Sequence, residues 1–143
     1  MAIANLHETL LSYAMRKSQL TLEISQLQAQ KHLSLLSRGD ASSIKAQDEH
    51  EIREFYKALY ESDSDYQGKY RDYTQIPDFE EEMNKIAAKY QEEVEQLEAW
   101  EAQLDAQITT NSAELEEVNA YMESLKSMLS SNIQEDFNFG MYS

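Results

Sequence analysis

The residues best suited to chemistry in this sequence stand at 63–68, which read Asp-Ser-Asp-Tyr-Gln-Gly. This run resembles the start of a calcium-binding EF-hand loop, which has acids at its first and third positions and glycine at its sixth. The loop also requires a bidentate glutamate at position twelve, where this chain has Thr74, and Gln67 occupies the fifth position. We therefore expect residues 63–68 to form an acidic turn that binds no calcium.

No other group of side chains has the composition of a catalytic or metal site. The chain has no cysteine, which excludes thiol chemistry and disulfides. His7, His32 and His50 follow no metal-ligand spacing. Residues 38–40 form the Arg-Gly-Asp tripeptide that integrins recognise, but a junction between two helices explains the same Gly and Asp. We expect no enzyme activity, no cofactor and no metal.

The charge of the chain is unevenly distributed. The net charge is −15 at pH 7; residues 1–60 carry seven Lys or Arg and seven Asp or Glu, whereas residues 61–143 carry five and twenty. So acidic a segment repels phosphate, and we expect no binding to nucleic acid. No run approaches the ~18 apolar residues of a membrane span, and the N-terminus lacks a signal-peptide pattern. We expect a soluble protein without a cleaved signal, either cytoplasmic or exported by a route that needs none.

Long helices should position these residues, because the chain of 143 residues has only three Gly and one Pro. Its length fits a single domain. We expect one helix over 3–37 and a second over 41–61, joined at 38–40 by a turn or a kink, a choice that the pattern leaves open. In the first helix, apolar residues alternate at spacings of three and four, as in a coiled coil: Ile3, Leu6, Leu10, Tyr13, Leu20, Ile24 and Leu27.

The second half of the chain predicts a loop followed by one long helix. Residues 62–78 contain a glycine, the only proline and several acids, so we expect an acidic, Tyr-rich loop where the chain reverses. Asp78 is a candidate N-cap for a coiled-coil helix over 79–136. Twelve of its fifteen core positions are apolar, and so long a helix needs a partner along its length. The predicted fold is all-α: a long antiparallel helical hairpin with a shorter, broken N-terminal arm, assembled into an oligomeric bundle or filament.

Aromatic residues indicate where copies of the chain would meet. Tyrosine and tryptophan are enriched in protein interfaces, and we hypothesise an interface at Tyr66, Tyr70 and Tyr73, with Trp100 nearby. The alternative is that the loop packs against its own hairpin. The apolar tail at 137–143 should dock, either within its own chain or on a neighbour, through Phe137, Phe139, Met141 and Tyr142.

Asn111 interrupts the apolar stripe of the long helix, as do Glu101 and Asn132. A polar residue at a core position commonly fixes the register of a coiled coil. Asn111 therefore has two interpretations, a register-setting contact or a place where the seam widens.

Two resemblances accompany these patterns. Residues 14–23 (Ala-Met-Arg-Lys-Ser-Gln-Leu-Thr-Leu-Glu), the Gln-rich stretch up to Lys31, and residues 132–137 (Asn-Ile-Gln-Glu-Asp-Phe) resemble the opening and close of uncharacterised coiled-coil proteins of gut bacteria. That family implies no activity or site residues. In architecture the chain is also similar to the helical-hairpin subunits of type III secretion needles and filaments.

These patterns predict a structural subunit that associates with itself, in a bacterial filament or a ring-like assembly, and that can also contact other protein subunits. The alternative is a cytosolic coiled-coil adaptor or export chaperone that presents its acidic surface to a basic partner.

Overall fold

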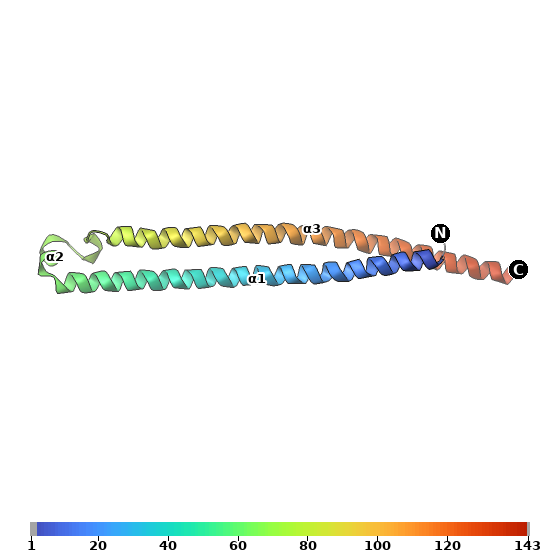
Figure 1. The fold of residues 1–143 in the computed structure, drawn as a ribbon, viewed down its shortest axis with the longest axis horizontal. Helices are drawn as coiled ribbons and strands as arrows, with labels where there is room; N and C mark the ends of the chain where they lie inside the picture. The colour runs from blue at the N-terminus through green and yellow to red at the C-terminus, as the bar shows by residue number, and fades with distance from the viewer. Residues whose placement is uncertain (1–2, 143) are drawn as a thin grey trace. The chain divides into compact units, whose positions relative to one another are not determined.

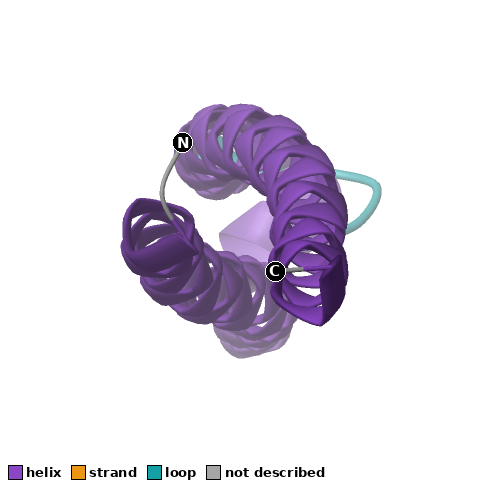
Figure 2. Cartoon of the chain, turned by 90° about the vertical axis from the view of Figure 1, so that its right-hand side faces the viewer, coloured by secondary structure: helices purple, strands orange, loops and turns teal. Residues whose placement is uncertain are grey.

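Two long helices make up most of the protein in the computed structural model, which describes the chain over residues 3–142 and its side chains over residues 3–135. Helix α1 spans Ile3–Ser62 and helix α3 spans Phe79–Tyr142, and they pack against each other (Figure 1). Two short segments join them, α2 at Ser64–Lys69 and the 3-10 turn η1 at Tyr73–Gln75. Residues 3–142 contain no strand, and the loops lie in the connection (Figure 2). The prediction of an all-α helical hairpin is confirmed.

One of two compact units joins the beginning of α1, up to Gln30, to α3 from Gln103 onward. The helices run antiparallel here, because Arg16 pairs with Glu114 whereas Glu23, further along α1, bonds Asn111, which comes earlier in α3. Leu20 is fully buried, and such a leucine contributes about 1.5–3 kcal/mol relative to an exposed one. The core of this unit contains Leu20, Val118 and Met122, with Leu10, Tyr13, Ala14 and Leu115 packed against them.

The second unit comprises residues 31–102, which include the connection. Its helices are also antiparallel, since Ser34 bonds Glu101 and Tyr56 packs edge-on against Phe79 with ring centroids 5.4 Å apart. Its core contains Tyr56, Ile76 and Phe79, with Ile52, Leu59, Tyr60, Tyr70, Tyr73 and Met83 packed against them.

The predicted break at residues 37–40 is wrong, because α1 continues from Ile3 to Ser62 without interruption. A Gly inside a helix costs only about 1 kcal/mol relative to Ala, and Gly39 lies on an open face, where an added Cβ would meet nothing within 4 Å. On the side that faces α3, Arg38 pairs with Glu101 and Ala41 is buried. Contacts with α3 on either side of Gly39 therefore outweigh its weak helix preference.

The connection is more ordered than the predicted loop over 62–78. Asp63 caps α2 by accepting a hydrogen bond from the Asp65 amide at 2.9 Å, and Asp72 caps η1 by accepting one from the Thr74 amide at 2.9 Å. The residues that resemble an EF-hand loop therefore form a capped helical turn. At the other end of the chain, α3 continues to Tyr142, so residues 137–142 prolong the helix that we predicted to end at 136.

A tight turn starts α3, and Asp78, the candidate N-cap, directly precedes the first helical residue. The Phe79 amide donates to the Ile76 carbonyl at 3.2 Å, with Pro77 in the second position and Asp78 in the third. Asp78 has φ 74°, so this is the pattern of a type II turn, which places a left-handed residue third. Its carbonyl accepts the first helical bond, from the Glu82 amide at 2.9 Å. An N-cap residue ordinarily has an extended backbone, whereas this turn holds Asp78 in the left-handed region.

This backbone makes residue 78 a test of the turn. We expect Asp78→Val to lower the free energy of unfolding by about 1–3 kcal/mol, because a β-branched residue is strained at positive φ. Asp78→Gly removes the same carboxylate without strain and should leave stability unchanged or raise it. Urea unfolding followed by circular dichroism measures both variants. Equal losses for Val and Gly would show that the carboxylate matters and the backbone does not.

Candidate functional site

The structure brings together no metal centre within the residues it describes, where no group of three or more His, Asp or Glu side chains could hold an ion. His7, His32 and His50 are all exposed and belong to separate parts of α1. None of the described helices is long and apolar enough to cross a membrane.

A buried polar layer links α1 and α3 at Glu101. Ser34 is fully buried, and its hydroxyl donates to Glu101 Oε1 at 2.9 Å. The Arg38 guanidinium donates to Glu101 Oε2 at 2.8 Å and lies 3.7 Å from Glu98. The Glu101 side chain is only 16% exposed. One carboxylate thus accepts from two α1 side chains separated by a helical turn, a charge-assisted arrangement that demands a specific alignment.

The polar layer belongs to a longer polar stretch of α1 that faces α3. Five of its six inward positions are polar or charged, although the same face is apolar earlier in the helix. A polar stretch of this kind makes sliding of the helices costly, since sliding separates Glu101 from the Ser34 hydroxyl that donates to it. The six positions are Lys31, Ser34, Arg38, Ala41, Lys45 and Asp48.

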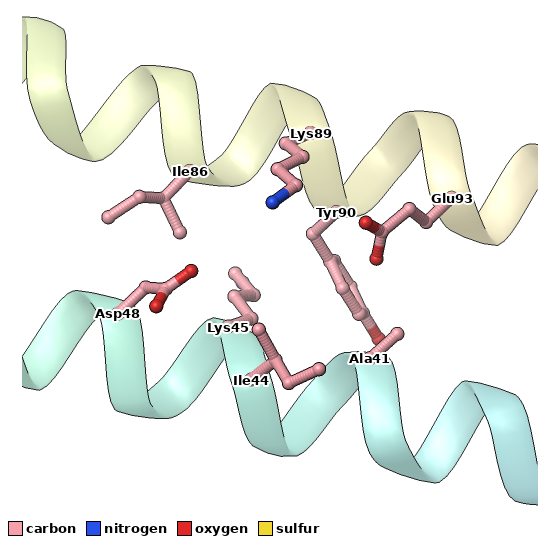
Figure 3. Close-up of a pocket in the computed structure, with 8 residues that line it drawn as sticks. All are labelled: Ala41, Ile44, Lys45, Asp48, Ile86, Lys89, Tyr90 and Glu93. Atoms are coloured by element: carbon pink, nitrogen blue, oxygen red, sulfur yellow. The ribbon is translucent and has the colours of Figure 1, made fainter.

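Lys45 shows how a cation is accommodated in this seam. Its ammonium lies 5.0 Å from the centre of the Tyr90 ring, a cation–π distance, and 3.4 Å from Glu49. Figure 3 shows Tyr90 reaching from α3 toward Ala41 on α1. The space that remains is about 10 Å³, barely enough for one water molecule. This place is a tight helix contact and has no room for a small-molecule ligand.

The tyrosines of the connection pack within their own chain. The Tyr60 hydroxyl lies 3.1 Å from both the Tyr70 and the Arg71 carbonyl oxygens and shares its single hydrogen between them. Tyr73 packs edge-on against Phe79 with centroids 5.5 Å apart. Tyr66 and Tyr70 form a ring pair at 5.7 Å. These contacts agree with the alternative interpretation, in which the loop packs against its own hairpin. Tyr66, Tyr70 and Tyr73 are only half-buried. Part of each ring is therefore open to a partner.

Three groups in these units have shifted acidities. Burial raises the pKa of Tyr56, with a further contribution from Glu82. The Thr74 hydroxyl and amide both donate to Asp72 and lower the pKa of that carboxyl. The hydrogen bond to the Glu117 carboxylate raises the pKa of Tyr121. The raised pKa values favour the neutral phenol of Tyr56 and Tyr121, and the lowered pKa favours the carboxylate of Asp72. Because these forms already exist at neutral pH, none of the three groups is prepared for proton transfer.

The remaining predicted site residues have separate environments. Asn111 is half-buried and donates to Glu23 Oε2 at 3.2 Å, at the edge of a polar groove that also contains Gln26 and Gln107. It therefore bonds across the seam at its rim, and its role in register stays a prediction. Trp100 is half-buried on α3. The side chains of Phe137, Phe139, Met141 and Tyr142 lie outside the described residues, and the docking of this tail stays a prediction.

Sequence reasoning missed an exposed apolar row on α1. The signal was present, because five large apolar residues recur at intervals of eleven, which is three helical turns. The first unit exposes 52% of Leu11 and 59% of Leu22, with Met15 at 67%. In the second unit, the row members Leu33, Ile44 and Phe55 are each more than half exposed, and so are the nearby Leu35 and Leu36. The row consists of Leu11, Leu22, Leu33, Ile44 and Phe55.

Comparison with known proteins adds no relative from which a role could be taken: the chain matches no family model, no curated protein and no solved structure.

The polar layer generates a test at Glu101. We expect Glu101→Ala to lower the free energy of unfolding by about 1–3 kcal/mol, because it leaves the Ser34 hydroxyl and the Arg38 guanidinium without this acceptor. Glu92→Ala on the exposed side of α3 is the matched control, with an expected change below about 0.5 kcal/mol. Urea unfolding measures both. A loss at Glu101 no larger than that at Glu92 would contradict the role of the layer.

Proposed function

We propose that the protein is a structural subunit that associates with itself through the exposed apolar row of α1. The observation that carries this proposal is the exposure of the row, in which Leu11 and Leu22 of one unit and Leu33, Ile44 and Phe55 of the other are all more than half exposed. Met15, beside the row in the first unit, is also more than half exposed. Exposed apolar side chains that gather on one helix face mark interaction sites, and in the first unit Leu11 and Met15 stand about one helical turn apart.

The packing of α1 supports association as the use of this surface. One side of α1 already contacts α3 through Leu20, which is fully buried and packs with Val118 and Met122. The row lies outside that seam, so α1 has apolar residues on two sides. A helix of this type packs with more than one partner, as in helical bundles. A filament or a ring-like assembly, as in the secretion subunits that the chain resembles in architecture, is the form of association that we propose.

The net charge of −15 opposes association and makes the proposal testable. Like charges on neighbouring copies repel, and salt screens this repulsion over a length of about 10 Å at 0.1 M and less at higher concentration. Hydrophobic contacts keep their strength in salt. We therefore expect self-association to strengthen when salt is raised from about 20 mM to about 500 mM.

Sedimentation velocity over a range of protein and salt concentrations measures this effect, and negative-stain microscopy shows whether the assemblies are filaments or rings. Leu33→Glu should weaken association about tenfold or more, since it replaces ~1.5–3 kcal/mol of burial with a charge. Gln28→Glu adds the same charge at another exposed position of α1 and should have a small effect. A protein that stays monomeric at all concentrations, in high salt, would disprove the proposal.

The second candidate is an adaptor or export chaperone that binds a basic partner. Its support is the charge of α3, which has ten Asp or Glu and no Lys or Arg from Tyr90 to Leu125. Attraction between opposite charges weakens in salt, so binding of a Lys-rich peptide would fall over the same salt range in which self-association rises. The sign of the salt dependence thus separates the two functions.

A further inference from the structure

Resting on the proposed self-association, we propose that two copies meet through an antiparallel contact between their α1 helices, centred on Leu22, with both α3 helices turned away from the contact. The occupant of the exposed face of α1 in the first unit is thus the same face of a second copy.

The shape of this face suits close helix packing. Leu22 and Met15 are 59% and 67% exposed, and the positions between and beyond them carry the small, exposed residues Ser18, Ser25 and Ala29. Large side chains separated by small ones form the ridges and grooves through which helices interdigitate.

Three residues of α1 between Thr9 and Gln30 are charged. Arg16 and Glu23 bond residues of α3, whereas the exposed Lys17 lines a shallow surface groove together with Leu22. Arg16 donates to both carboxylate oxygens of Glu114, at 2.8 and 2.9 Å. Glu23 accepts from Asn111. Lys17 therefore lies at the edge of the proposed contact, where its long side chain can keep the ammonium in water while Leu22 is covered. A second copy can therefore cover Leu22 without burying an unpaired charge.

The charge of α3 determines which side of a second copy can approach. From Gln103 to Leu125, α3 carries five Asp or Glu and no Lys or Arg. Two α3 helices placed together would bring like charges into contact, at a cost that an α1 pair avoids. The exposed carboxylates Glu116, Glu117 and Glu123 then remain in water.

An antiparallel arrangement satisfies this face better than a parallel one. A two-fold axis at Leu22 pairs Leu22 with itself and sets Met15 of each copy opposite Ala29 of the other, a large residue against a small one. Parallel helices in register would set Met15 against Met15 and Ala29 against Ala29, so that large residues meet large ones and small residues meet small ones. Antiparallel helix dipoles also attract, whereas parallel ones repel.

The absence of cysteine allows each contact to be tested by a single introduced thiol. Under mild oxidation, at a concentration where sedimentation detects association, we expect Leu22→Cys to form a disulfide-linked dimer, since a disulfide requires Cα atoms within about 4.4–6.8 Å. A mixture of Met15→Cys and Ala29→Cys chains should give the mixed dimer well above either variant alone. Ala113→Cys, exposed on α3, is the control and should not cross-link. Circular dichroism verifies that each variant retains its helix.

Each other outcome identifies what is wrong. Efficient dimers from Met15→Cys alone would overturn the antiparallel arrangement in favour of a parallel one. Association without a Leu22→Cys dimer, or with an Ala113→Cys dimer, would overturn the α1 contact while self-assembly stands. The absence of association in sedimentation would overturn the proposed function, and this inference with it.

Discussion

The structure depends on the seam between two antiparallel helices, which supplies the core of each unit. Neither helix has a thick core to rely on, so each seam position carries a large share of the stability of its unit. Fully buried side chains are correspondingly few, and two of them, Leu6 and Leu20, come from α1. A thin seam also leaves most of each helix surface outside the contact, and any further apolar residue on α1 must face water or another molecule.

The polar stretch of the seam has a different task from the apolar stretch. Leucines tolerate one another in several alignments, whereas the oxygens of Glu101 reach Ser34 and Arg38 in only one. A shift of one heptad would replace Arg38 by Lys31 or Lys45 opposite Glu101 and would replace the Ser34 hydroxyl by Leu27 or Ala41. The carboxylate would then lose the Ser34 hydrogen bond and the bond from the guanidinium. The apolar layers thus supply affinity between the helices, and the polar layer selects their alignment.

The sequence predicted the helical hairpin because long amphipathic patterns and a single proline leave few alternatives. It placed the start of the second long helix correctly at Phe79, since Pro77 limits the backbone before it. The break at residues 37–40 was predicted wrongly because local preference for Gly-Asp was outweighed by contacts of Arg38 and Ala41 with α3, which no local rule contains. Of the predicted site, the heptad count located Glu101 as an interruption but could not supply its partners on α1. The exposed row was not predicted because the heptad spacing identifies one apolar stripe on each helix, whereas the row recurs every eleven residues.

The packed connection has a consequence for the order of folding. The Tyr60 contacts with Tyr70 and Arg71 close loops of only ten or eleven residues, whereas the Arg16–Glu114 pair closes one of ninety-eight. The entropy cost of closure rises with loop length. Once the tyrosines and the Ile76–Phe79 turn hold the chain reversed, each next pair of seam residues closes only a short additional loop. The two helices can then pair progressively from the connection toward the termini. In this order the Glu101 layer forms before the apolar layers of the first unit, so the alignment is selected before those layers pack.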